Sequence, residues 1–134
     1  MKIARKLLLA GVALVFVAVP ATAATRVVPP GELEQSVEIR NVTVHDGMVS
    51  GTVVNTTGRT LEHVRLVIDH HWRWRNEFHP ERDNPGRADF YVLPSTIPPH
   101  GEVEFTYRPS EPLPVRSDGH FVTSVGVASV EQVG

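Results

Sequence analysis

The sequence predicts an all-β domain, a β-sandwich of about seven antiparallel strands, and three observations predict it. Apolar and polar residues alternate along Leu61–Trp74 (LEHVRLVIDHHWRW), as in a strand with one buried face. Shorter runs with the same alternation occur on both sides of it, and turn residues separate them every eight to twelve residues. No segment after residue 23 has a convincing helical periodicity. Short strands at this spacing are typical of sandwiches.

Leu61–Trp74 is predicted to be the central strand of a sheet. One parity is mostly apolar and the other is mostly charged. Because strand side chains alternate between the two faces of a sheet, we expect the first set to face the interior and the second to face solvent. The inward set is Val64, Leu66, Ile68, His70, Trp72 and Trp74, and the outward set is Arg65, Val67, Asp69, His71, Arg73 and Arg75.

Residues 1–23 are predicted to be a cleaved signal peptide, which implies a periplasmic or secreted protein. Lys2, Arg5 and Lys6 precede the uncharged run Leu7–Val19, and Ala21-Thr22-Ala23 follows it. A membrane-spanning helix needs about 20 apolar residues, so the shorter run favours cleavage over an anchor. We therefore expect no membrane span in the mature chain.

The domain itself is predicted over residues 37–134, after a flexible or edge-following leader at residues 24–36 that contains Pro29-Pro30-Gly31. Strand-like alternation begins at Val37 and slips in parity near Arg40-Asn41, which indicates a β-bulge. Asp46-Gly47 is a strong signal for a two-residue hairpin turn, because both central positions require positive φ. Met48–Asn55 is the expected return strand.

After the central strand, residues 75–89 (RNEFHPERDNPGRAD) are predicted to be a long polar loop. Phe90–Leu93 is predicted to be a short strand, and Ile97–Gly101 to be a turn. Residues 103–107 alternate as a half-buried strand, and a last strand runs from His120 to about Val130. Because long ordered loops are often functional, residues 75–89 are the first candidate for a functional site.

The strand pattern resembles the small bacterial immunoglobulin-like domains of the FxLYD type. The residues that carry the resemblance are Val49–Gly58 (VSGTVVNTTG), Leu61, Val64–Ile68, Ile97–Glu102 (IPPHGE) and Phe105. The resemblance covers roughly residues 37–130, and it implies an immunoglobulin-like sandwich in a secreted or envelope-facing protein. It implies no common activity, because function resides in sites rather than in folds.

Two departures from this family limit what the resemblance implies. The aromatic-Leu-Tyr-Asp signature after the central strand is replaced by Asp69–Trp74 (DHHWRW), and an insertion at residues 75–88 lengthens the next loop. No role of those family residues is therefore carried over. Trp72 is expected to face inward from the third strand, where immunoglobulin-like sandwiches often have a core tryptophan.

Composition and charge restrict the class of partner. The chain has 134 residues, 41% hydrophobic and 21% charged, and no cysteine, so no disulfide can contribute to its stability. Without the three basic residues of the signal peptide, ten basic residues face fifteen acidic ones, a formal charge of −5. This charge disfavours nucleic acid and anionic membranes as partners.

A metal site is the first chemical alternative, because seven histidines occur in the chain. His70 and His71 are neighbours in a strand and point to opposite faces, so they cannot share one ion without a bulge. The feasible set is Asp69 and His71 with a third ligand from the following loop, either His79 or a carboxylate, and such imidazole and carboxylate ligands suit zinc or copper. The competing interpretation is a solvated strand face beside a hydrogen-bonded His70, with no cofactor.

A binding surface is the second alternative, formed by Arg73, Trp74, Arg75, Phe78 and His79. Aromatic and arginine side chains dominate binding hot spots. The same rings can instead close the open end of the core. No ordering of Ser, His and Asp marks a catalytic triad, so no enzyme is expected.

Together these patterns predict an exported, non-enzymatic immunoglobulin-like module of unspecified oligomeric state. It is expected to contact a protein or a component of the cell envelope through residues 72–89. A zinc or copper protein and a carbohydrate-binding module are the alternatives.

Overall fold

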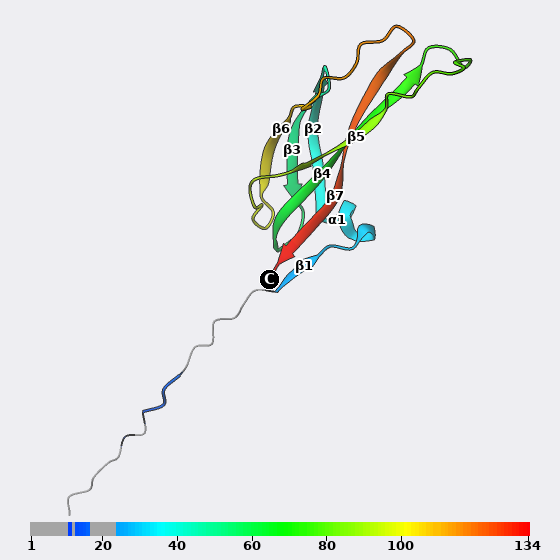
Figure 1. Ribbon diagram of the computed structural model, residues 1–134. Coiled ribbons are helices and arrows are strands. Elements are labelled where there is room, and N and C mark those ends of the chain that lie inside the picture. The colour runs from blue at the N-terminus through cyan, green and yellow to red at the C-terminus, as the bar shows by residue number, and fades with distance from the viewer. Residues whose placement is uncertain (1–10, 12, 17–23) are drawn as a thin grey trace, which may run out of the picture.

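A computed structural model describes residue 11, residues 13–16 and residues 24–134, so most of the predicted signal peptide lies outside the described residues. Figure 1 shows two facing β-sheets. One has the strand order β1-β7-β4-β5 and the other β2-β3-β6, and all pairs are antiparallel. This confirms the predicted all-β sandwich, with seven strands in the described residues. The strands are β1 (Thr25–Val27), β2 (Val37–His45), β3 (Met48–Asn55), β4 (Thr60–Trp74), β5 (Arg87–Val92), β6 (Glu102–Tyr107) and β7 (Gly119–Val133).

The first hairpin forms as its turn residues predict. Asp46 and Gly47 both have positive φ, 50° and 80°, as a type I′ turn requires, and they join β2 to β3. The register between these strands shifts between Arg40 and Thr43, and Asn41 has a φ of 54°. The parity slip near Arg40-Asn41 is therefore the predicted β-bulge.

β4 lies between β7 and β5 and is the central strand of its sheet. Its even-numbered side chains from Val64 to Trp72 are all buried, as the alternation predicts, and Trp74 is half-buried. A second bulge was not predicted. The register with β7 shifts after Glu62, and His63 has a φ of 48°. Because of this extra residue, Leu61 and Val64 both face the core and are fully buried.

The leader, residues 24–36, follows the edge of a sheet and is ordered rather than flexible. Residues 25–27 form the edge strand β1, which pairs with β7 at Val133, Gln132 and Glu131. The 3₁₀ turn η1 (Pro30–Glu32) and the single-turn helix α1 (Leu33–Ser36) then lead to the other sheet. Val28 and Leu33 are buried in the core, and this burial holds a segment whose Pro-Pro-Gly sequence alone predicts a loop.

The loop after β4 is shorter than predicted, because β5 begins at Arg87 rather than Phe90. Arg87, Asp89 and Tyr91 pair with β4 and lie on its inner side, where Asp89 and Tyr107 form a hydrogen bond between the sheets. The strand at Phe90–Leu93 was predicted, but its polar start at residues 87–89 was missed, because charged residues in a sequence resemble a loop. The loop that remains, residues 75–86, is named the tip loop.

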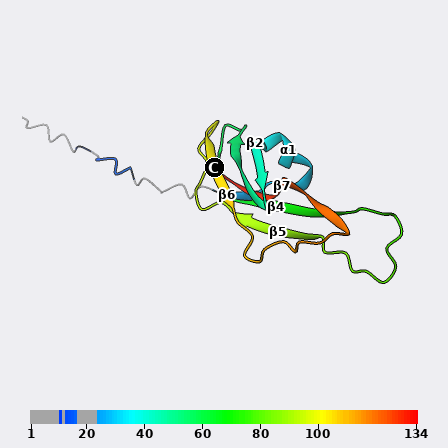
Figure 2. The same ribbon diagram turned by 90° about the horizontal axis from the view of Figure 1, so that it is seen from above.

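The ends of β4 and β7 form an arm that extends past the neighbouring strands. β5 pairs with β4 only as far as His70, so residues 71–74 pair with β7 alone. Figure 2 shows this arm and the tip loop reaching beyond the body of the sandwich. A connector, residues 108–118, runs from β6 to β7 and packs on the arm.

The main core lies between the sheets and toward the other end of β4. Leu61, Ile97, Val49 and Val53 are fully buried there. Trp72 is buried too, as expected, but it packs in the arm and not in this cluster. In the part of the chain described, no helix is both long and apolar enough to cross a membrane.

Candidate binding site at the arm

The arm depends on a close approach between Trp72 and β7. Gly119 pairs with Trp74, and a Cβ atom at Gly119 would lie only 2.5 Å from Cζ2 of Trp72. The absence of a side chain at this position therefore lets the Trp72 ring lie against the backbone of β7. The ring also packs on Phe121, with centroids 4.8 Å apart.

Aromatic rings follow one another along the inner side of the arm. The rings of Trp72 and Trp74 are perpendicular, with centroids 5.8 Å apart, as in an edge-to-face pair. His79 folds back from the tip loop and stacks on Trp74 at 4.0 Å with an interplanar angle of 8°. The tip loop is thus fixed to the end of β4 by one stacked pair.

Arg116 of the connector joins the two tryptophans to an ion-pair network. Its guanidinium carbon lies 5.1 Å from the ring centroid of Trp72 and 5.5 Å from that of Trp74, within cation–π range. Its Nε and Nη2 donate to the two carboxylate oxygens of Asp118 at 2.9 and 2.6 Å. Arg82 of the tip loop donates to the same carboxylate at 3.1 Å.

Asp118 is the electrostatic centre of this network. The hydrogen bond from Arg116 holds the pKa of Asp118 well below its usual range, and the bond from Arg82 acts in the same direction. Since Asp118 immediately precedes β7, its charge fixes the connector and the tip loop to the same strand end.

A pocket of about 310 Å³ opens beside this network. Phe78 is 84% exposed at the pocket, and the half-buried stack of Trp74 on His79 forms its wall. The full lining is Trp74, Asn76, Phe78, His79, Pro80, Arg82 and Asp118. Rings, an amide, a guanidinium and a carboxylate therefore converge on one concave surface, as in binding sites that combine apolar contact with polar orientation.

The structure brings three of the five predicted binding residues together, namely Trp74, Phe78 and His79. Arg73 and Arg75 are exposed, but neither lines the pocket, and Arg73 lies on the outward parity of β4.

Sequence reasoning missed Arg82, Arg116 and Asp118. Nothing local in a proline-rich connector shows that its arginine will lie over two distant rings.

The predicted metal ligands Asp69, His71 and His79 are not brought together. Asp69 and His71 are exposed on the outward parity of β4, whereas His79 stacks on Trp74 at the inward parity. Opposite faces of one strand cannot present ligands to a single ion.

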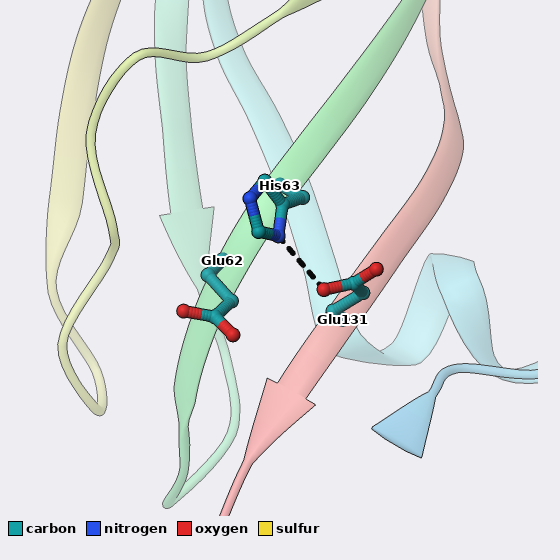
Figure 3. A group of neighbouring side chains, drawn as sticks. All are labelled: Glu62, His63 and Glu131. Carbon is teal, nitrogen blue, oxygen red and sulfur yellow. Dashed lines mark hydrogen bonds and ion pairs between the residues drawn. The ribbon is translucent and has the colours of Figure 1, made fainter. Parts of the chain in front are cut away.

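A different set of possible ligands gathers at the bulge in β4, as Figure 3 shows. Glu62, His63 and Glu131 offer three donor atoms within 4.8 Å of one another. His63 Nδ1 lies 2.7 Å from Glu131 Oε2, and this hydrogen bond raises the pKa of His63. The bulge places His63 on the same outward side as Glu62, which strict alternation would forbid.

His70 belongs to a buried polar network rather than to a metal site. It is fully buried, with Nδ1 2.9 Å from Thr123 Oγ1 and Nε2 3.2 Å from Asp89 Oδ2. The Tyr107 hydroxyl donates to the same carboxylate oxygen at 2.7 Å. Burial, together with this bond, raises the pKa of Tyr107 to about 12. Both ring nitrogens of His70 have partners, which agrees with the hydrogen-bonded interpretation.

These observations describe an all-β sandwich with an aromatic arm and a pocket at its end. Comparison of the chain with protein-family models, with curated proteins and with solved structures finds no match. The resemblance to FxLYD-type domains stays a prediction.

Proposed function

We propose that this protein is an exported, non-enzymatic β-sandwich module that binds a protein of the cell envelope through the pocket at the end of the arm. The exposed ring of Phe78 beside that pocket carries the proposal. A phenylalanine in solvent gains free energy on burial, about 1.5–3 kcal/mol for a full side chain. Arg82, which is 60% exposed, supplies an adjacent charge and hydrogen-bond donors.

Contacts within the fold hold the residues that line the pocket in place, which favours a rigid binding site. Trp74 is stacked on His79, and Arg82 is paired with Asp118, so both walls are held before any partner arrives. A site that is already ordered loses less conformational entropy on binding. The same contacts disfavour the carbohydrate alternative, because His79 and Arg116 already cover the Trp74 ring on which a sugar would stack.

Affinity capture with a paired variant tests the proposal. The immobilised chain is exposed to an envelope extract of its host and compared with the double variant Phe78→Ala, Arg82→Ala. Val44→Ala is the matched control, because Val44 is an exposed side chain on β2, 44% exposed. We expect the parent chain and the control to retain the same protein and the double variant to lose it. Equal retention by all three would refute the proposal.

The metal alternative now rests on Glu62, His63 and Glu131, because these residues and not the predicted set lie together. One imidazole and two carboxylates suit zinc. Calorimetric titration of the folded chain with zinc, beside the variant Glu131→Gln, tests this alternative. Heat of binding that is lost in the variant would support it, and a flat trace for the parent chain would eliminate it.

A further inference from the structure

β7 has a long edge that is unpaired over most of its length, although α1 and β2 lie beside it at Gly126 and Val127. It spans Gly119–Val133 and pairs with β4 along this whole length. On its other side, β1 pairs only with Glu131, Gln132 and Val133, and the Val28 N–H bonds to the Val130 carbonyl. Within residues 24–134, no strand pairs with β7 between Gly119 and Ser129 on that side.

The orientation of the backbone groups on this edge follows from one bond. The Asp118 carbonyl accepts from the Arg75 N–H at 2.9 Å, so even-numbered residues at this end of β7 face β4. N–H and C=O groups alternate between the two sides of a strand. The odd-numbered residues from 119 to 127 therefore direct their N–H and C=O groups to the uncovered side.

Between Gly119 and Val127 this edge lacks the features that protect other edges from pairing, and the one register shift of β7 against β4 in this region lies beyond it, between Val127 and Ser129. Edge strands are usually short, charged, bulged or interrupted by proline. β2 carries Glu38, Arg40 and a bulge, and β6 carries Glu102 and Glu104. Residues 121–130 (FVTSVGVASV) contain no charge and no proline. They also have the β-branched composition that favours strand pairing.

We propose that the β7 edges of two copies pair antiparallel across a two-fold axis, so that the protein is a homodimer with one sheet continuous through both subunits. An antiparallel pair centred on Thr123 places odd-numbered residues opposite odd-numbered residues, and their backbone groups then bond to each other. The same register places Val122 opposite Ser124 of the second copy. No like charges oppose each other within the uncharged run, so the edge is complementary to itself.

The two ends of the segment 24–134 lie away from this edge. β1 runs antiparallel to β7, and the Gly134 N–H bonds to the Ala24 carbonyl, so Ala24 and Gly134 both lie at the end of the sheet far from Gly119. Figure 2 shows the uncovered stretch in the arm, with the connector joining β7 from the side of β5. Arg87 at the start of β5 donates to the Glu111 carbonyl of that connector.

Sedimentation equilibrium on charge-paired variants tests the dimer and its register. Val122 and Ser124 are exposed on the outer face, so both tolerate substitution. Val122→Lys with Ser124→Lys places like charges opposite each other, whereas Val122→Lys with Ser124→Glu places opposite charges there. We expect the first pair to raise the dimer Kd by at least about tenfold and the second to leave the dimer intact. Val92→Lys, on the edge strand β5, is the control and should have no effect.

Two results would overturn the proposal. One is a parent chain that stays monomeric at every concentration measured. The edge would then be available to pair with a strand of another protein. The other is a dimer that both charge pairs affect equally. Hydrogen exchange gives an independent readout, because the amides of residues 121, 123 and 125 should become more protected as concentration rises. These residues are separate from Phe78 and Arg82, so failure of the dimer leaves the proposed function standing.

Discussion

The two ends of β4 differ. At the end near Asn55, named the closed end, buried polar groups have hydrogen-bond partners within the chain. At the other end, formed by the arm and the tip loop, aromatic rings lie at the surface. Asn55 is fully buried and its Nδ2 donates to the carbonyls of Arg59, Ile97 and Pro98, while its Oδ1 accepts from Thr57. In the tip loop, Phe78 is 84% exposed, and in the arm the indole nitrogen of Trp72 is buried without a hydrogen-bond partner in the described residues.

This contrast separates stability from recognition. One asparagine at the closed end joins three chain segments, so the free energy of its hydrogen bonds contributes to folding. The arm leaves apolar surface exposed that only a partner can bury. Substitution of the buried Asn55 should therefore destabilise the protein, and substitution of the exposed Phe78 should alter binding alone.

The largest effect is expected for Asn55→Ala, which removes all of these bonds. Asn55 is fully buried and makes five side-chain hydrogen bonds, each worth about 0.5–1.5 kcal/mol net, so the free energy of unfolding should fall by about 3 kcal/mol. Urea unfolding followed by circular dichroism measures it. Asn76→Ala in the tip loop is the control and should change stability by less than about 0.5 kcal/mol. Equal losses would remove the distinction between the ends.

A smaller effect, within the arm, is expected for Gly119→Ala. The new methyl group meets the Trp72 ring at 2.5 Å, so the arm must shift, at a cost of about 2 kcal/mol. Gly126→Ala on the same strand is the matched control, because its Cβ would lie 3.5 Å from Val67 Cγ1, an ordinary contact. Thermal unfolding of the two variants compares them. Equal melting temperatures would show that the close approach is unimportant.

Acid should loosen the arm before it unfolds the closed end. The pKa of Asp118 is lowered in the fold by Arg116, so its contribution to stability is present at neutral pH. That contribution is lost progressively as pH falls from the unfolded carboxyl value of about 4 toward the lower folded value. Both tryptophans of the chain lie in the arm, so their fluorescence reports on it alone. Fluorescence should change at a higher pH than circular dichroism, and Asp118→Asn should abolish the early change; coincident transitions would contradict this.

The smallest effect is expected at the bulge in β4, away from both the core and the tip. The hydrogen bond with Glu131 raises the pKa of His63 in the folded protein. The contribution of this pair to folding stability is therefore present below the unfolded histidine pKa of about 6.5, and it is lost as pH rises through the raised folded pKa. Glu131→Gln should lower the His63 pKa in an NMR titration, and Glu62→Gln, which lacks the direct bond, should lower it less. A larger shift for Glu62→Gln would reverse this assignment.

The strands could be predicted from sequence where alternation is strict. From Val64 to Trp72, β4 has one buried face and one solvent-facing side, and the Asp46-Gly47 turn determines the first hairpin. β1 and the start of β5 were missed, because a three-residue strand beside prolines has no periodicity and charged strand residues resemble a loop.

The candidate site was predictable only in part. Trp74, Phe78 and His79 are close in sequence, and aromatic composition identifies them. Arg116 and Asp118 reach the same place from the far end of a connector, and such long-range contacts depend on the fold as a whole. The bulge that brings His63 beside Glu131 has no strong sequence signal either, since positive φ is uncommon for any residue other than glycine.

Site-specific photocrosslinking tests the central claim most directly, that recognition resides at the tip pocket. A photoreactive phenylalanine analogue replaces Phe78 in one chain and Val44 in another, and both chains are irradiated with the same envelope extract. We predict one discrete crosslinked protein from position 78 and none from position 44. Identical products from both positions, or none from position 78, would contradict the account.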